Sequence, residues 1–375
     1  MHLSETAQSV QSTIRAFARD RIAPRAAEFE AAGGYPPELF TELAELGLFG
    51  MTAPESYGGA ELDHVTYALA LIEIAAADGA LSTILSIQNS IVIGGLLKDG
   101  TEAQKSRFLP ELTSGRAVGA FALTEPDAGS DAAALRTQAV RQGDAWVMNG
   151  AKQFISSAKS GQVTIVIAVT DREAGKRGMT AYLVPTDTPG YIVDKVEHKL
   201  GQGASDTCAL RFENMRVPDE LRLGAEGAGY KVALSNLEAG RIGIGAQSVG
   251  MAQAALEIAV DYARDRRSMG KPILEHQAVG FRLADLAARL EAARQLVLHA
   301  ADLKDHGQPC LREASMAKLV ASETAEAVVS GAIQTLGGYG YLEEYGLARI
   351  YRDVRVCQIY EGTSDIQRMV IARSL

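Results

Sequence analysis

The chain has 375 residues, of which 47% are apolar and 22% are charged, a balance typical of folded globular proteins rather than disordered ones. Its formal net charge of -9 disfavours a nucleic-acid partner, because nucleic acids bind to extended basic surfaces. The chain is longer than most chains that fold around a single hydrophobic core, so we expect two or three packed domains.

Neither secretion nor membrane insertion is indicated by the sequence. Cys208, Cys310 and Cys357 stand far apart without a Cys-x-x-Cys pair, which disfavours a disulfide framework and a thiolate metal site and favours the reducing cytoplasm. The N-terminus lacks the apolar run of a secretory signal. The most apolar long segment, residues 81–97, is interrupted by polar residues, and we expect it not to span a membrane; among them are Ser82, Ser86, Gln88, Asn89 and Ser90.

Residues 1–117 are expected to form an N-terminal α-helical domain. The sequence TEAQ at Thr101 to Gln104 matches a capping box ahead of a helix that reaches about Ser114. Pro36, Pro37 and two Gly-Gly pairs mark connections between helices.

Residues 118–225 are expected to form a central antiparallel β domain. Short apolar runs separated by Gly, Asp and Pro predict its strands, and no helix of useful length interrupts them. The runs are AWVMNG, VTIVIAVT, GMTAYLVP and TCALRFENMRV.

Residues 226–375 are expected to form a C-terminal helical bundle. Apolar residues recur every three or four positions between Val249 and Ala263 and again between Leu283 and Ala300. A third helical run, residues 313–336, ends at Gly337 and Gly338, a plausible helix stop. Long helices with short connections predict an antiparallel bundle, and the overall order is α, then β, then α.

One carboxylate in the last helical region is a candidate general base. In QIYEGTSDIQR, Glu361 follows two large side chains and precedes residues that can start a helix. A glutamate there can simply favour the positive end of a helix dipole. A half-buried position would instead raise its pKa towards neutrality, which suits a general base.

Other common catalytic motifs are weak or absent. GGYGYL, GIGAQSVG and GQGASD lack the full spacing of a dinucleotide fingerprint, and none lies in a strand-to-helix turn of a βαβ unit. AGKRG is not a phosphate-binding loop, no HExxH is present, and the histidines offer no metal-ligand pairing. We therefore expect no metal site.

Two polar segments are candidate ligand sites. FALTEPDAGSD combines a strand-like start with Pro and small residues, so its amides and hydroxyls could meet a polar ligand, although an ordinary turn explains it equally well. In RDRRSMGKPI, Arg266 and Ser268 could hold a phosphate, or the segment could be a solvated helix end.

Six segments in order resemble the acyl-CoA dehydrogenase family over nearly the whole chain: FALTEPDAGSD, NGAKQFISS, LEAGRIGIGAQSVG, RDRRSMGKPI, IQTLGGYGY and QIYEGTSDIQR. The resemblance implies an α+β fold, with an N-terminal helical domain, a central β domain and a C-terminal four-helix bundle, that holds non-covalent FAD, usually as a homotetramer. It implies an enzyme of fatty-acid β-oxidation that converts an acyl-CoA thioester to the trans-2-enoyl-CoA. Electrons then pass to an electron-transferring flavoprotein.

The resemblance also assigns roles to individual residues. Glu361 matches the base that removes the α proton while a hydride leaves the β carbon, and its backbone N–H matches a donor to the thioester carbonyl. Matching cofactor positions, some of them reaching the flavin of a neighbouring subunit, are Phe121, Leu123, Thr124, Ser130, Phe154, Ser156, Arg266, Ser268, Met269, Gln334, Gly338 and Thr363. Matching acyl-CoA positions are Ser130, Glu238, Arg241, Tyr360 and Gly362.

The sequence departs from the family pattern at a few of these positions. Phe154 replaces a common Trp, Ser156 a Thr, Met269 a Phe and Glu238 an Asp. Some members carry the base on the bundle helix just before the matching arginine, where this chain has Gly240. Glu361 is then the candidate base.

The sequence leaves some choices open. The C-terminal motif resembles that of short-chain and short branched-chain members, which predicts such a substrate. An acyl-CoA oxidase would share the first half-reaction, and a non-catalytic protein that binds CoA esters or flavin could share the fold.

Overall fold

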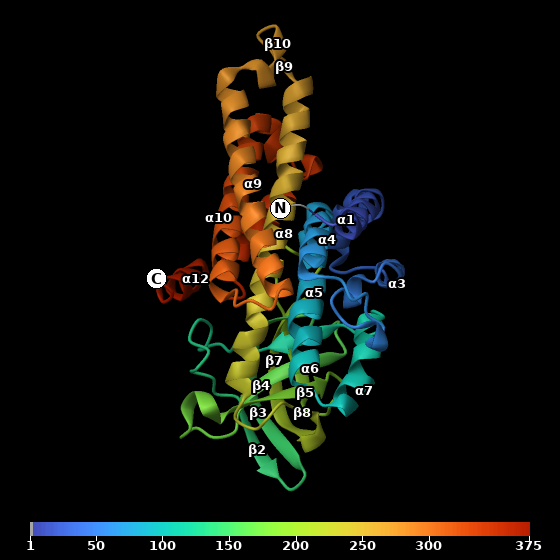
Figure 1. Ribbon diagram of the computed structural model, residues 1–375, viewed down its shortest axis with the longest axis vertical. Helices are drawn as coiled ribbons and strands as arrows, with labels where there is room; N and C mark the ends of the chain where they lie inside the picture. Colours follow the sequence, from blue (N-terminus) through green and yellow to red (C-terminus); the bar gives the residue numbers. More distant parts are fainter. Residues whose placement is uncertain (1–2) are drawn as a thin grey trace.

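The computed structural model describes residues 3–375 and shows the expected order of a helical part, a sheet and a second helical part. Three long C-terminal helices run along the long axis of the molecule, the sheet lies at one end of them, and the N-terminal helices pack alongside (Figure 1).

The N-terminal part is helical, as the sequence predicts. Its helices end where turn residues stand: Gly33 closes α2 in a left-handed conformation, and Pro37 begins α3. The predicted capping box at Thr101 and Gln104 is present. The helices are α1 (Glu5–Phe17), α2 (Ala26–Ala32), α3 (Pro37–Glu45), α4 (His64–Ala77), α5 (Gly79–Ser86), α6 (Gly94–Asp99) and α7 (Glu102–Thr113).

A continuous helical run at Gly79–Asp99 joins α5 and α6 through a π-helical segment. By length and composition this run could cross a membrane, contrary to the expectation from its polar residues. However, 83% of its most apolar window is buried inside the protein. Most of this run is therefore packed against other parts of the protein.

The central part is one twisted sheet. Its strands run in the order β6-β7-β3-β2-β4-β5-β8, and neighbouring strands are antiparallel except at the short β2–β4 contact. A further strand, β1, pairs in parallel with β4, which the sequence pattern did not predict. The strands are β1 (Gly119–Ala122), β2 (Gln138–Gln142), β3 (Ala145–Ser156), β4 (Val163–Val169), β5 (Met179–Pro185), β6 (Tyr191–Val196), β7 (Thr207–Pro218) and β8 (Arg222–Leu223).

The C-terminal part is built on α8 (Gly229–Asp265), α9 (Gln277–Asp305) and α10 (Leu311–Leu336). The predicted apolar stripes are buried, and α10 ends at Gly337, as expected. Two short helices, α11 (Leu347–Val354) and α12 (Ser364–Ala372), pack against α10. The C-terminal part thus has three long helices, where the sequence predicted a bundle of four.

The connection from α8 to α9 is a hairpin of β9 (Arg267–Ser268) and β10 (Lys271–Pro272). Met269 and Gly270 form its turn, both with positive φ, and Met269 is 91% exposed. The hairpin lies at the end of the molecule farthest from the sheet (Figure 1).

Candidate active site

Glu361 lies in an irregular link between α11 and α12. Its φ is 52° and that of Gly362 is 91°, so two consecutive residues have left-handed backbone. Such a conformation is unusual for a residue with a side chain, and it directs the Glu361 carboxyl away from the path of the chain. The N-cap of α12 is Thr363, which accepts a hydrogen bond from Ile366 N at 3.3 Å. Glu361 is therefore not the helix cap.

Both carboxylate oxygens of Glu361 are buried and have no hydrogen-bond partner within residues 3–375. Burial raises the pKa of this carboxyl to about 7, against the opposing effects of Lys318 and Arg241. A carboxyl with this pKa can accept a proton at neutral pH and hold it. Buried carboxylate oxygens without hydrogen-bond partners at such a site indicate that a ligand binds against them.

Gly240 on α8 provides the space for this carboxyl. A Cβ added to Gly240 would lie 2.1 Å from Glu361 Oε2 and 2.9 Å from the carboxyl carbon. The next residue, Arg241, is buried and donates from Nη1 to Ser315 Oγ at 3.2 Å, while its Nε has no partner in the part of the chain that the structure describes. The absence of a side chain at Gly240 thus lets the base from the α11–α12 link rest on α8.

Lys318 of α10 holds the backbone beside the base. Its ammonium donates to Gly362 O at 2.7 Å, and Gln367 Nε2 donates to the same carbonyl at 2.9 Å. Burial lowers the pKa of Lys318 to about 8. The lysine therefore fixes the link and supplies positive charge that favours the ionised form of Glu361.

The predicted acyl-CoA positions differ in how they face this site. Gly362 adjoins the base, and Arg241 follows Gly240. Tyr360 turns its hydroxyl into the protein, where it donates to Gln247 Oε1, and the residue as a whole is half-buried beside Glu361. Glu238 is near Lys304 Nζ at 3.7 Å and Cys310 Sγ at 3.4 Å, while Ser130 is exposed in the loop after β1.

Two predicted flavin segments lie together at the sheet. Gln153 N donates to Thr124 O at 2.9 Å, which joins the segment that holds Phe121 and Leu123 to the segment that holds Phe154 and Ser156. Phe154 has a φ of 61° and is 64% exposed, so its ring is free to cover a ligand.

A buried ion pair fixes these two segments. Lys152 Nζ lies 2.8 Å from Glu125 Oε1 and donates to Leu123 O at 3.0 Å. The Glu125 carboxylate also accepts from the backbone N–H groups of Arg136 at 2.6 Å and Thr137 at 3.0 Å. Lys152 is fully buried, and burial lowers its pKa to about 8. The pair thus ties β3 to the loop that follows β1.

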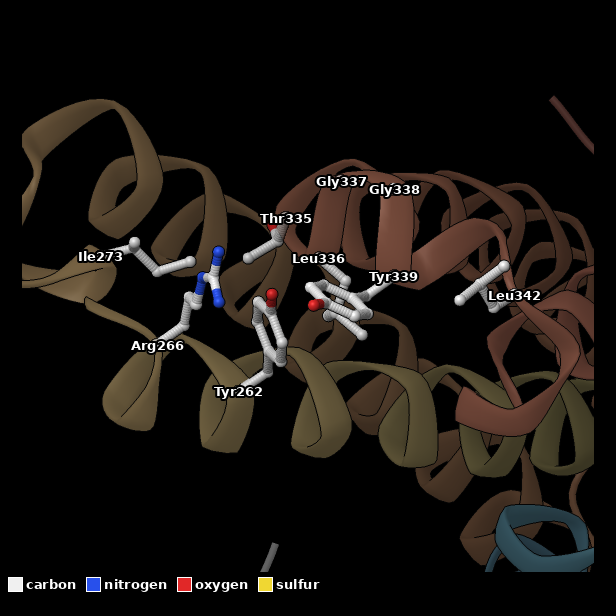
Figure 2. A pocket seen from close by; sticks show the side chains of 9 residues that line it. All are labelled: Tyr262, Arg266, Ile273, Thr335, Leu336, Gly337, Gly338, Tyr339 and Leu342. Atoms are coloured by element: carbon white, nitrogen blue, oxygen red, sulfur yellow. The ribbon is translucent and has the colours of Figure 1, made fainter. Parts of the chain in front are cut away.

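The other predicted flavin positions lie at the far end of the bundle. Arg266 and Gly338 line one pocket of about 390 Å³ together with Tyr262, Thr335 and Tyr339 (Figure 2). The Arg266 guanidinium lies 5.6 Å from the centre of the Tyr339 ring. Ser268, Met269 and Gln334 are exposed near this end of the bundle. Within one chain these residues do not meet the Phe154 group (Figure 1).

Comparison with known proteins gives the family. Models of the N-terminal, middle and C-terminal domains of acyl-CoA dehydrogenases match residues 4–116, 120–215 and 227–375. The mouse mitochondrial short-chain specific acyl-CoA dehydrogenase is 45% identical over 375 residues, which cover 100% of this chain and 91% of the mouse protein.

Solved structures agree with this result. Butyryl-CoA dehydrogenase from Megasphaera elsdenii has a TM-score of 0.97 and 41% identity, with 100% of this chain and 99% of that chain covered. A chain from a structure described as an electron transferring flavoprotein of Acidaminococcus fermentans has a TM-score of 0.98 and 40% identity, with 100% and 98% covered. The chain belongs to the acyl-CoA dehydrogenase family. It is therefore an FAD-dependent oxidoreductase of the type that acts in fatty-acid β-oxidation.

The residues present fit a flavin in an acyl-CoA dehydrogenase. An exposed aromatic ring at Phe154, held on a strained backbone, adjoins the Thr124 segment, and an unpartnered buried carboxyl lies in the C-terminal part. Within residues 3–375, no cluster of His, Cys, Asp or Glu could hold a metal ion.

Sequence reasoning missed several residues of the site. Lys318 falls on the buried stripe of α10 between Ala314 and Ala321, so a charged residue at a core position was a visible signal. Lys152 is likewise a lysine inside a strand. The contribution of Gln247 had no such signal, because a glutamine in a helix is most often a surface residue.

Proposed function

We propose that this protein dehydrogenates a short-chain or short branched-chain acyl-CoA thioester to the trans-2-enoyl-CoA, with Glu361 as the general base. The observation that carries the proposal is the buried carboxyl of Glu361, whose pKa is raised to about 7 and whose oxygens have no partner in the described chain. FAD supplies the acceptor for the hydride when it is bound. The chain itself supplies the base, the orientation and the exclusion of water.

The backbone of the base supports binding of the thioester carbonyl. Within residues 3–375, the N–H of Glu361 donates no hydrogen bond. It adjoins Gly362, whose own carbonyl is fixed by Lys318. An N–H donor held in place beside the base can stabilise negative charge on the carbonyl oxygen as the α proton leaves.

The surroundings of Glu361 favour a short acyl group. Gly243 lies one turn along α8 from Gly240, and a Cβ there would be 2.3 Å from Ser86 Oγ and 2.9 Å from the Tyr67 hydroxyl. In the other direction along α8, the Asn236 amide lies against Gly95. One turn of helix rises about 5.4 Å. The space for an acyl chain along α8 is therefore filled by protein atoms within roughly one turn of the base on each side.

A complete flavin site requires a second copy of the chain. Arg266 lies 26 positions after Gly240, equivalent to roughly 39 Å along a helix at 1.5 Å per residue. One chain therefore presents its hairpin end far from its own base and sheet. We propose that the Arg266 group serves the flavin of a neighbouring subunit in a homotetramer.

We further propose that the electrons pass to an electron-transferring flavoprotein in a reducing, cytoplasmic compartment. The similarity to a chain from a structure so described supports the partner. The three cysteines are free and buried, which supports the compartment.

Anaerobic mixing with a series of CoA esters tests the function. We expect butyryl-CoA or a short branched ester to remove the yellow absorbance of the flavin and palmitoyl-CoA not to do so. The product, identified by mass and by its double bond, is expected to be the trans-2-enoyl-CoA. A purified protein that takes up no FAD would instead indicate a non-catalytic relative.

The oxidase alternative is tested on the same sample. Once substrate has reduced the flavin, air is admitted and peroxide is measured. We expect slow reoxidation without a protein acceptor and fast reoxidation with an electron-transferring flavoprotein. Rapid formation of peroxide would assign the protein as an acyl-CoA oxidase.

A further inference from the structure

The hydroxyl of Tyr360, the residue before the proposed base, is enclosed by polar side chains from three parts of the fold. It donates to Gln247 Oε1 of α8, accepts from Gln202 Nε2 at 3.4 Å and lies 3.5 Å from Thr83 Oγ1 of α5. These three partners are at most 5% exposed. We name the set Thr83, Gln202, Gln247 and Tyr360 the hydroxyl clamp.

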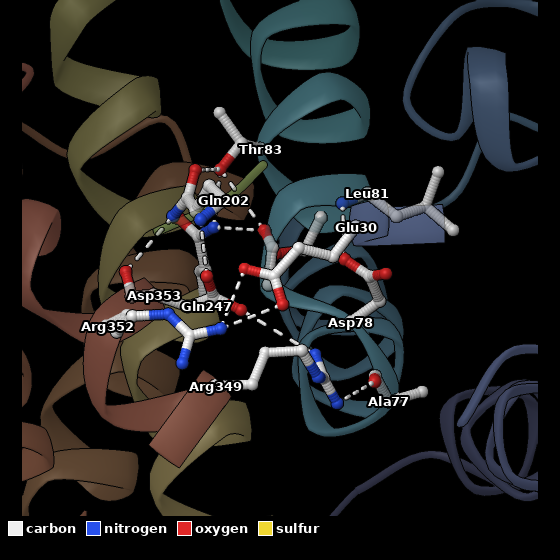
Figure 3. Close-up of polar contacts among 12 residues, drawn as sticks. Glu30, Ala77, Asp78, Leu81, Thr83, Gln202, Gln247, Arg349, Arg352 and Asp353 are labelled. Carbon is white, nitrogen blue, oxygen red and sulfur yellow. Dashed lines mark hydrogen bonds and ion pairs between the residues drawn. The ribbon is translucent and has the colours of Figure 1, made fainter. Parts of the chain in front are cut away.

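The clamp is closed by hydrogen bonds among its own members. Thr83 Oγ1 donates to Gln202 Oε1 at 2.8 Å, and Gln247 Nε2 donates to Thr83 Oγ1 at 2.5 Å and to Gly79 O at 2.6 Å. Thr83, Gln202 and Gln247 converge in Figure 3. The amide orientations of both glutamines are thereby set, since each oxygen faces a donor and each nitrogen faces an acceptor.

Gln202 brings the β domain into the clamp. It lies in the loop between β6 and β7, has a φ of 53°, and donates from its backbone N–H to Asp353 Oδ1 at the end of α11. At the neighbouring Gly201, a Cβ would lie 2.4 Å from the backbone carbonyl group of Arg352, so only glycine permits this close approach. The loop thus rests directly on the segment that leads to Glu361.

We propose that Gln202 is a positioning residue for the general base: it fixes the Tyr360 hydroxyl with Thr83 and Gln247, and so holds Glu361 in its left-handed conformation over Gly240. This inference rests on the proposed function of Glu361. The sheet carries the proposed flavin segments, α5 and α8 provide Thr83 and Gln247 as partners of the Tyr360 hydroxyl, and Gln202 thereby positions the base relative to the sheet. A left-handed residue persists only where the surrounding structure over-determines it, and the clamp supplies that constraint.

The test compares Tyr360→Phe with Tyr191→Phe. Both remove one buried hydroxyl, but that of Tyr191 bonds to Thr164 and Ala158 inside the sheet domain. For Tyr360→Phe we expect flavin reduction at saturating butyryl-CoA to slow by about tenfold, because small misplacement of a catalytic group is costly in rate. KM is expected to stay within about threefold, and the pH profile of reduction to shift to lower pH as water reaches the carboxyl. Tyr191→Phe should leave the rate and the profile unchanged.

Hydrogen exchange provides a readout independent of turnover. Amides of residues 359–363 are expected to exchange faster in Tyr360→Phe and Gln202→Asn than in the wild type, because shortening Gln202 breaks its reach to both Thr83 and Tyr360. Asparagine tolerates the left-handed backbone at position 202. Thr83→Val should behave as Tyr360→Phe does, and Thr83→Ser, which keeps the hydroxyl, should restore the wild-type rate.

The outcomes separate the two proposals. If no acyl-CoA reduces the flavin of the wild-type protein, the proposed function is wrong. Hydrogen exchange at residues 359–363 then decides by itself whether the hydroxyl clamp holds Glu361 in place. If Tyr360→Phe binds FAD, reduces it within twofold of the wild-type rate and shows wild-type exchange, the positioning role is refuted. If Tyr360→Phe does not bind FAD, the same readouts on Gln202→Asn and Thr83→Val decide.

Discussion

The carboxyl of Glu361 rests on Gly240, so closely that a Cβ on that glycine would lie 2.1 Å from Oε2. The two residues come from different segments, the α11–α12 link and the middle of α8. A side chain at position 240 of α8 or at position 361 of the link could therefore place a carboxyl in the same small space. In this chain the carboxyl comes from Glu361. A carboxyl on α8 at position 240 would thus occupy the space that the Glu361 carboxyl fills in this chain.

Gly240→Ala is expected to impair the base while leaving the fold intact. The added methyl group must displace the carboxyl, and we expect flavin reduction by butyryl-CoA to fall by at least about tenfold. Gly94→Ala is the matched control, because the nearest described atom to its added Cβ, Asn89 O, is at an ordinary 3.5 Å. Alanine at either helical position should not lower the melting temperature through propensity. Wild-type reduction rates in Gly240→Ala would show that the carboxyl is elsewhere in solution.

Moving the base across this contact is a stricter test. In the double variant Gly240→Glu with Glu361→Gly, a carboxyl from α8 enters the same volume and glycine suits the left-handed backbone at position 361. We expect measurable flavin reduction, at least about tenfold above that of Glu361→Gly alone. The chain-length preference should also change, since the α8 side of the pocket is rebuilt. Equal rates in the two variants would contradict a shared volume.

The element order and the place of Glu361 before α12 could be predicted from the sequence, but the contacts between these elements could not. Apolar spacing located α8, α9 and α10, and the motif at residues 358–368 located Glu361 before the start of α12. The parallel pairing of β1 with β4 was not predicted, because the four residues of β1 carry no pattern that distinguishes parallel from antiparallel pairing.

Residues that act through distant contacts left little trace in the sequence. Gln202 reaches Asp353 and Tyr360 across more than 150 positions, so neither spacing nor propensity reveals its role. Met269 stands in a hairpin turn at a positive φ where Gly or Asn is the usual choice. Local rules fail at this position, as they often do near functional sites.

Glu361→Gln is expected to separate binding from chemistry. Glutamine keeps the size of the side chain but cannot accept the α proton, so flavin reduction should fall by at least about 10²-fold, the scale for loss of a general base. Acyl-CoA binding, followed by the change in flavin absorbance on titration with the enoyl product, should stay within a few-fold. Normal bleaching of the flavin in this variant would refute the assignment of the base.

The rate of flavin reduction should depend on pH through this same carboxyl. Burial raises the pKa of Glu361 to about 7, and the base must be ionised to act. In the free enzyme kcat/KM should therefore be constant above pH 7 and fall about tenfold for each pH unit below it. Lys318 lowers the pKa of Glu361, so Lys318→Met should move this limb to higher pH. If the fall in kcat/KM moves to lower pH in Lys318→Met, or if the wild-type enzyme shows no such fall above pH 5, the assignment of the base is contradicted.

Lys152→Met is expected to destabilise the flavin segments. The change leaves the Glu125 carboxylate buried without its ammonium partner, and breaking a buried pair in this way costs about 3 kcal/mol or more. We expect a lower melting temperature and reduced FAD content, because Lys152 also holds Leu123 O. Arg116→Met breaks an exposed pair with Glu111 and should change little. Adding Glu125→Gln to Lys152→Met should recover part of the loss, since it removes the unpaired charge. If both methionine variants melt alike and retain FAD alike, the buried pair does not hold the site together.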